Sequence, residues 1–332
     1  MPTAKKTNAG TWKVRVYSHK DENGKKHYKS FTAATKKDAE MLALQYSHKE
    51  EMHLTTFADK MEKYLDSKSN VLSPSTFRSY TCMSHVLLKE YPQFCAKTKI
   101  EQADVQNLVN EMAKTHKPKS VKNYNAFVSV ILGDSRHFKV TLPQSIKNQY
   151  RIPTQAEFQT LLNTVKNTEL EIPVMLGGFC MMRRSEICGL TLDDINGDMI
   201  HIKSGVVLGE SGYVKKTTKT VSSDRYIQAP QFLVDKIKKQ GYVTTLTPAA
   251  ISDAFHRVVV KIGLDGMVFH GLRHFGASYR HSVLNIPTAH IQRDGGWSDA
   301  HTLEQIYRHA LDDEHKRYSA QTNRAFEQMY DL

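Results

Sequence analysis

The stretch His270-Gly271-Leu272-Arg273-His274 places three polar side chains within about one turn of a predicted helix. His270, Arg273 and His274 therefore fall on one side of that helix. Arginine offers a planar fork of donors that matches a phosphate group, and histidine can add a further hydrogen bond. In an otherwise apolar, helix-forming context, this pattern favours an anion-binding site.

Two further segments carry residues of the same kind. Arg183 and Arg184 interrupt an apolar stretch that predicts a helix, and Glu186, one turn after Arg183, can orient it. Trp297 is followed ten residues later by Tyr307. Taken singly, a helix salt bridge or a core tyrosine explains each feature better than chemistry does. Only the ordered combination indicates a function.

In this order the segments resemble the tyrosine recombinase, or phage integrase, family. That family's signature is Arg, a Lys in a β-hairpin, His-x-x-Arg, His or Trp, and Tyr. The resemblance covers about residues 155–310 by motif and extends to the front of the chain by architecture. It implies the catalytic residues Arg183, Lys219, His270, Arg273, Trp297 and Tyr307, with Glu186 and His274 in supporting roles.

The hairpin lysine is matched by Lys219 within Thr218-Lys219-Thr220. Lys215 and Lys216 are alternatives, because the register of a hairpin is hard to fix from sequence.

The first arginine also has an alternative. The family usually has a small glycine two residues before it, where this chain has Met181, so Arg184 competes with Arg183. The spacing to Glu186 favours Arg183.

The resemblance implies transesterification of DNA without a cofactor or a metal. Tyr307 attacks the phosphodiester and forms a 3′-phosphotyrosyl link, and a free 5′-hydroxyl leaves. Arg183 and Arg273, helped by His270, stabilise the charge that develops on the phosphate oxygens. Lys219 protonates the leaving oxygen. Four protomers assemble on two DNA sites and pass through a four-way junction.

Charge and length predict several basic modules at the front of the chain. The 332 residues carry 46 Lys and Arg against 34 Asp and Glu, a net charge of +12. Residues 1–53 have 11 bases against 6 acids, 54–139 have 13 against 8, and 140–332 have 22 against 20. The front therefore suits a polyanion such as double-stranded DNA.

The hydrophobic patterns predict an α+β fold that is mostly helical. We expect a small three-stranded sheet with one helix in an arm-type DNA-binding domain (1–53), because Trp12, Val14 and Val16 alternate with polar residues before an Asn-Gly turn. Four helices form a core-binding domain (54–139), followed by a linker (140–153). A mixed helical catalytic domain with a β-hairpin and a tail helix fills 154–332. The tail docks on a neighbouring protomer or forms a plain C-terminal helix; both readings stay open.

Other features narrow the class of protein. Four cysteines, Cys82, Cys95, Cys180 and Cys188, show no metal-binding spacing and suit a reducing cytosol. No apolar run is long enough to span a membrane, and no secretion signal begins the chain. We therefore expect a protein of the bacterial cytosol, associated with the nucleoid.

The resemblance implies an integrase or excision enzyme of a phage or conjugative element, and three other classes of protein fit the sequence less well. A type IB topoisomerase does not need separate basic front modules. A DNA-binding regulator does not need a nucleophile, and a metal-dependent nuclease needs an acidic triad. A DNA-bending accessory protein or an excisionase is a further partner that the resemblance allows.

Overall fold

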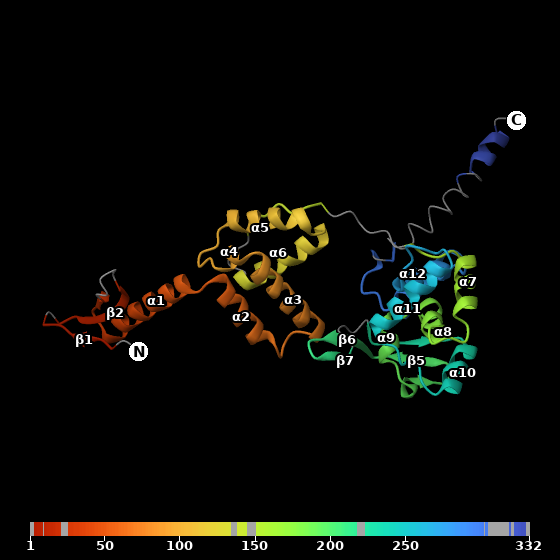
Figure 1. Cartoon of the computed structure of the whole chain (residues 1–332), viewed down its shortest axis with the longest axis horizontal. Coiled ribbons are helices and arrows are strands. Elements are labelled where there is room, and N and C mark those ends of the chain that lie inside the picture. Colours follow the sequence, from red (N-terminus) through yellow and green to blue (C-terminus); the bar gives the residue numbers. More distant parts are fainter. Residues whose placement is uncertain are drawn as a thin grey trace. The chain divides into compact units, whose positions relative to one another are not determined.

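The computed structural model describes residues 3–8, 10–20, 26–133, 138–144, 151–217, 223–301, 303–304, 319 and 322–329. It divides into two compact units, Met1–Ile146 and Lys147–Leu332 (Figure 1). This boundary falls inside the linker expected at 140–153. The division of the first unit into two DNA-binding domains remains a prediction. It is compatible with two separate hydrophobic clusters, one around Val14 and one around Phe57.

The N-terminal sheet consists of three antiparallel strands in the order β1-β2-β3. These are β1 (Lys5–Lys6), β2 (Trp12–Lys20) and β3 (Lys26–Ala33), followed by helix α1 (Lys36–Leu54). Val14 faces α1 and is buried with Ala39 and Ala43, so this core is small. The Asn-Gly turn predicted between the strands lies outside the described residues.

The helical part of the first unit contains one element more than expected. Its helices are α2 (Phe57–Lys68), α3 (Pro74–Glu90), α4 (Pro92–Cys95), α5 (Gln102–Thr115) and α6 (Pro118–Leu132). The short α4 begins at Pro92, which suits a first helical position. Thr56 caps α2 in a capping box with Asp59, and Ser73 caps α3, as their sequences predict. The inward faces meet in a core around Phe127.

Both ends of the expected linker are attached to the unit that they adjoin. Val140 and Leu142 pack against the helical core, and Gln106 exchanges two hydrogen bonds with the backbone of Thr141. On the other side, Arg151 donates to the carbonyl of Asp265 and pairs with Glu157. Residues 140–142 and Arg151 therefore belong to the folded units.

The second unit combines helices with two small sheets, as expected for a mostly helical α+β chain. The helices are α7 (Gln155–Val165), α8 (Glu171–Phe179), α9 (Arg184–Gly189), α10 (Gln231–Gln240), α11 (Pro248–Lys261), α12 (Phe269–Ser282) and α13 (Thr288–Gly295). The strands are β4 (Ile195–Asn196), β5 (Met199–Ile202), β6 (Ser204–Gly209), β7 (Gly212–Thr217) and β8 (Arg225–Gln228). Residues 322–329 form a further helix, on which Phe326 and Met329 are exposed.

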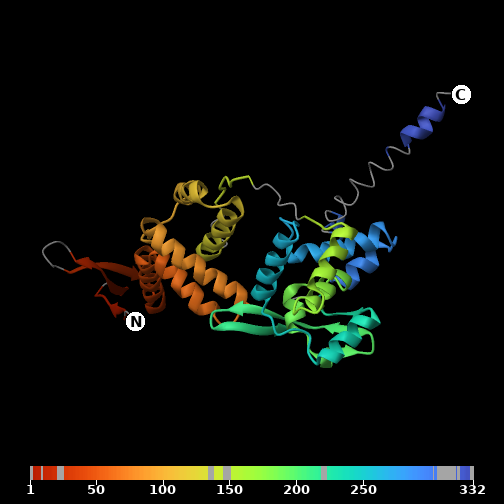
Figure 2. The same cartoon turned by 45° about the vertical axis from the view of Figure 1, so that its right-hand side comes forward.

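The two sheets have different surroundings. Strands β4, β5 and β8 form one antiparallel sheet, whereas β6 and β7 form a separate hairpin. Figure 2 shows this hairpin extending away from the helical body of its unit.

Helix α12 packs directly on α8: a Cβ added at Gly276 would lie 2.2 Å from the carbonyl oxygen of Gly178. Among the described helices, none is both long and apolar enough to cross a membrane.

Candidate active site

A break between α8 and α9 sets the position of Arg183. Met181 has a φ of 50°, in the left-handed region that glycine favours, so the chain turns sharply there. Arg183 is consequently the N-cap of α9. The apolar residues around it predict a continuous helix, and that prediction is wrong. The family's usual glycine therefore corresponds to a real backbone requirement, which Met181 meets at the cost of strain.

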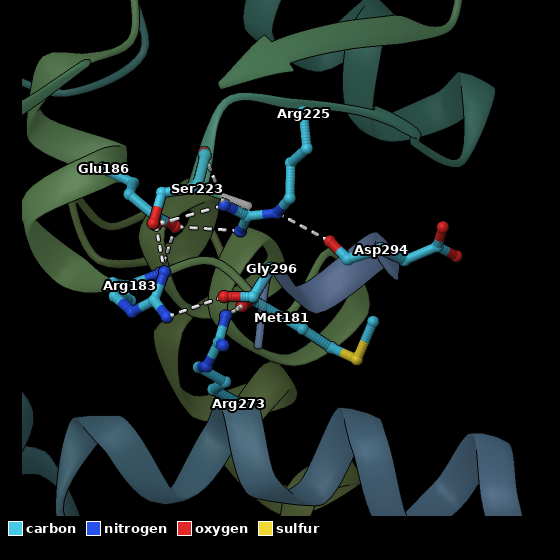
Figure 3. A network of polar contacts seen from close by, with 8 residues as sticks. All are labelled: Met181, Arg183, Glu186, Ser223, Arg225, Arg273, Asp294 and Gly296. Atoms are coloured by element: carbon cyan, nitrogen blue, oxygen red, sulfur yellow. Dashed lines mark hydrogen bonds and ion pairs between the residues drawn. The ribbon is translucent and has the colours of Figure 1, made fainter. Parts of the chain in front are cut away.

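Glu186 lies at the centre of a buried polar network (Figure 3). Its Oε1 accepts from Nη1 of Arg183 at 2.6 Å, and its Oε2 accepts from the backbone N–H of Arg183 at 2.8 Å. The guanidinium of Arg225 donates to the same two oxygens at 3.2 and 3.0 Å. Glu186 and Arg225 are buried, whereas the side chain of Arg183 is 34% exposed. Arg183 can therefore still reach a ligand.

The charges around Glu186 keep it ionised. Burial alone would raise the pKa of its carboxyl group. Hydrogen bonds and positive charge from Arg225, and then from Arg183, outweigh that effect, so the pKa lies below its usual value. One carboxylate thus faces two arginines, and the cluster keeps a net positive charge.

Arg273 lies on α12 and is only 1% exposed. Its Nη1 donates to the carbonyl oxygen of Met181, but its buried Nε and Nη2 have no hydrogen-bond partner among the described residues. Burial and the neighbouring charge of Arg183 lower the pKa of this guanidinium. A buried cation with two unsatisfied donors is costly, and an anion would relieve that cost.

Trp297 covers Arg273 from the C-terminal end of α13. The guanidinium carbon of Arg273 lies 3.6 Å from the centre of the indole ring, within cation–π range. Gly295 permits this placement, because a Cβ there would lie 1.8 Å from the ring. Gly296 ends α13 with a φ of 65°, and its carbonyl accepts from Nη2 of Arg183 at 3.0 Å. The turn 294–297 thus contacts both candidate arginines.

His270 and His274 lie one turn apart on α12, with ring centres 4.7 Å apart. His270 is exposed and His274 is buried. Although part of His270 is exposed, the protein around its imidazole desolvates the ring and lowers its pKa to about 4. The positive charges of Arg273 and Arg183 act in the same direction. Burial lowers the pKa of His274 to about 3, helped by His270. Both rings are therefore neutral near pH 7.

The structure separates Arg183 from its rival Arg184. The side chain of Arg184 is directed to Ser252 on α11, whereas Arg183 joins Glu186 and the turn at Gly296. The spacing argument that favoured Arg183 agrees with this geometry.

Two predicted catalytic residues, Lys219 and Tyr307, lie outside the described residues. The two alternatives to Lys219 as the hairpin lysine, Lys215 and Lys216, lie on β7. Leu303, four residues before Tyr307, is fully buried in the core of the unit. The structure therefore leaves both assignments as predictions.

Arg225 is the main residue of the network that the sequence reasoning missed. Strand β8 alternates buried and exposed residues, and Arg225 shares its buried face with Ile227. An arginine on the apolar face of an alternating strand is the signal that could have revealed it. Among the described residues, no group of three His, Cys, Asp or Glu could hold a metal ion.

Comparison with known proteins agrees with this geometry. Residues 152–314 match the model of the phage integrase family. A XerC-like tyrosine recombinase of Caldanaerobacter subterraneus subsp. tengcongensis is 22% identical to 93% of this chain and 96% of its own length. The Tn1549 transposon integrase, solved with transposon right end DNA, has a TM-score of 0.65 at 16% identity, covering 80% of this chain and 99% of that one.

Lambda integrase provides a second structural match. A tetramer bound to a Holliday junction gives a TM-score of 0.60 at 16% identity, covering 90% of this chain and 96% of that one. The family match spans the network around Glu186, the His-x-x-Arg box and Trp297. The chain therefore carries a catalytic domain of the phage integrase family and is a tyrosine recombinase, an enzyme that cleaves and rejoins DNA.

Proposed function

We propose that this recombinase integrates and excises a mobile element, a phage or a conjugative element, by forming a 3′-phosphotyrosyl link through Tyr307. The observation that carries the proposal is the pair of buried donors on Arg273 that have no partner among the described residues, together with the partly exposed Arg183. The positive charge of Arg183 acts on Arg273, and an anion bound by both would offset their repulsion. A scissile phosphate supplies both the charge and the acceptors.

Each candidate residue has a distinct task in this reaction. The phenol of Tyr307 attacks phosphorus, and the bond to the 5′-oxygen breaks. Arg183 and Arg273 stabilise the charge that develops on the non-bridging oxygens. His270 adds a hydrogen bond as a neutral ring, in keeping with its lowered pKa. Lys219 protonates the departing 5′-oxygen. Trp297 holds the guanidinium of Arg273 through a cation–π contact. Glu186 orients Arg183 by accepting its hydrogen bonds, and His274 packs against the ring of His270.

The partner that we propose is double-stranded DNA. The core sites are bound by 54–139 and the catalytic domain, and the arm-type sites by 1–53. In the N-terminal sheet, Arg15 lies over the ring of Tyr28, and Tyr17 and Tyr28 are exposed. Basic and aromatic side chains on one hairpin suit a major groove. We further propose a homotetramer on two DNA sites in the bacterial cytosol, with an excisionase or a DNA-bending protein as an accessory partner.

A nicked suicide substrate that carries the attachment site of the element tests the proposal. Cleavage beside the nick releases a short strand, so the covalent protein–DNA adduct accumulates and is counted on a denaturing gel. We expect an adduct that is lost in Tyr307→Phe. Adduct that persists in this variant and maps to another tyrosine, such as Tyr279 or Tyr318, would refute the assignment.

The same assay tests the source of the positive charge. Since arginines stabilise the phosphate in this proposal, EDTA should leave the rate of adduct formation unchanged. Cleavage that requires a divalent cation would instead support a metal-dependent nuclease.

A further inference from the structure

Arg225 makes four hydrogen bonds that link three parts of the catalytic unit. Its Nε donates to the carbonyl of Asp294 at 2.7 Å, and its Nη1 donates to the carbonyl of Ser223 at 3.2 Å. Its two terminal nitrogens also donate to the carboxylate of Glu186. The side chain is 4% exposed, so it does not itself reach DNA. Its effect on the site must pass through other residues.

The first such effect is on charge. Glu186 accepts two hydrogen bonds from Arg225 and two from Arg183, which fills the usual acceptor positions of a carboxylate. With both arginines present, the group of three carries one net positive charge. Without Arg225, Glu186 would form a neutral pair with Arg183 alone. The charge that Arg183 offers to a phosphate would then be largely cancelled.

The second effect is on geometry. Arg225 binds the carbonyl of Asp294, and Arg183 binds the carbonyl of Gly296 two residues later. These carbonyls belong to the last turn and cap of α13, where a helix attracts cations. Trp297 follows directly and lies over Arg273. The hydrogen bond from Arg225 to this turn therefore fixes the position of the Trp297 ring over the guanidinium of Arg273.

From these contacts we infer that Arg225 is a positioning residue for strand cleavage: it shares Glu186 with Arg183, so that Glu186 does not cancel the charge of Arg183, and it anchors the turn before Trp297, so that both phosphate-binding arginines are aligned. This inference rests on the proposed function, because it assigns Arg183 and Arg273 to the scissile phosphate. Because the side chain of Arg225 is 4% exposed, its substitution should affect cleavage more than DNA binding.

The test uses two substitutions and two substrates in the full-length protein. Arg225→Gln removes the charge and the fork, and Arg225→Lys keeps a buried cation beside Glu186. Each variant is assayed on the suicide substrate and on the same DNA with a methylphosphonate at the cleavage site. A methyl group in place of one non-bridging oxygen removes the negative charge of the phosphate, so stabilisation by Arg183 matters less.

On the ordinary phosphodiester, we expect Arg225→Gln to cleave at least about tenfold more slowly than the unchanged protein, with DNA affinity within about threefold. Arg225→Lys should fall between the two. On the methylphosphonate, the difference in cleavage rate between Arg225→Gln and the unchanged protein should shrink to a few-fold. Arg183→Ala serves as the positive control, and its loss of cleavage rate should also be smaller on the methylphosphonate than on the phosphodiester. If Arg225→Gln fails to fold, Arg225→Lys carries the same comparison.

Arg280→Lys is the matched control for a purely structural role. Arg280 is another desolvated arginine of this unit, but its guanidinium donates to the carbonyls of Phe179 and Gly276 and does not share Glu186. Any loss in this variant should be the same on both substrates. An equal loss on both substrates for the Arg225 variants, or full activity on the phosphodiester, would overturn the inference.

Failure of the inference can be told apart from failure of the proposed function. If the unchanged protein forms an adduct through Tyr307 and the Arg225 variants match it, only the role of Arg225 is wrong. If the unchanged protein forms no tyrosine adduct on the phosphodiester, the proposed function itself is wrong.

Discussion

The guanidinium of Arg273 is enclosed between the ring of Trp297 and the carbonyl of Met181. This arrangement holds an arginine that is 1% exposed while two of its nitrogens have no hydrogen-bond partner among the described residues. The indole face stabilises the charge, and the carbonyl fixes the rotation of the side chain. The ring of Trp297 thus supports Arg273, independently of any proton transfer.

Substitution of Trp297 tests whether the ring or its N–H group matters. Trp297→Phe keeps an aromatic face over Arg273 and should cleave within about tenfold of the unchanged protein, since a cation–π contact contributes about 0.5–2 kcal/mol. Trp297→Ala also leaves a cavity and should lose about a hundredfold or more. Single-turnover cleavage of the suicide substrate measures both. Equal losses in the two variants would show that the indole N–H carries the effect.

Substitutions of the neighbouring residues Arg183 and Arg184 should have different effects on the cleavage rate in the same assay. Arg183→Lys should lose cleavage by about a hundredfold while DNA binding changes little, because a point charge cannot reproduce the fork that meets Glu186, Gly296 and a phosphate together. Arg184→Lys is the control, since Arg184 turns to Ser252. The reverse result, with Arg184→Lys inactive and Arg183→Lys active, would move the catalytic assignment by one residue.

The helical parts of the site were predictable because their signals are local. The period of a helix places His270, Arg273 and His274 together, and the three-residue spacing links Arg183 to Glu186. Even there, the sequence suggested a continuous helix, because nothing in the apolar run shows that Met181 adopts a positive φ.

The non-local contacts were not predictable. The pair between Arg225 and Glu186 joins residues 39 positions apart, and the contacts of Arg183 and Arg225 with the 294–296 turn depend on how α13 docks. Periodicity reveals which face of an element is buried but not which element covers it. The linker shows the same limit, since only the folded units reveal that Thr141 and Arg151 are attached to them.

The buried imidazole of His274 predicts a loss of stability in acid. Its pKa of about 3 in the folded chain lies below the value of about 6.5 of an unfolded histidine. The unfolded state therefore binds more protons between these values. The stability is complete above about pH 6.5 and is lost as the pH falls toward 3. At pH 5 this one residue should cost about 2 kcal/mol relative to pH 7.5.

A tryptophan reporter makes this loss measurable. The chain has two tryptophans, so a Trp12→Phe background leaves Trp297 as the only one, located within the catalytic unit. Urea unfolding followed by its fluorescence at pH 7.5 and 5 gives the change in the free energy of unfolding. His274→Gln, which cannot bind a proton in this range, should show a smaller change. An identical change with and without His274 would contradict its buried, neutral state.

The identity of the general acid can be decided by changing the leaving group. Lys219→Ala should cleave an ordinary phosphodiester about a hundredfold or more slowly, because the departing 5′-oxygen then leaves without a proton. If sulfur replaces that 5′-oxygen, the leaving group is a thiolate, whose conjugate acid has a pKa of about 8.5 and needs no proton donor. Lys219→Ala should therefore cleave the sulfur substrate nearly as fast as the unchanged protein.

Lys215 and Lys216 provide the comparison on the same hairpin. They pair across β6 and β7 with Val206 and Gly205, so their backbone positions are defined. Lys215→Ala and Lys216→Ala should show no selective rescue by sulfur, because neither lysine donates the proton in this scheme. A lysine whose loss is rescued only on the sulfur substrate is the acid, since weaker DNA binding or a damaged fold would slow both substrates alike. Selective rescue of either variant, without rescue of Lys219→Ala, would transfer the role from Lys219 to that residue.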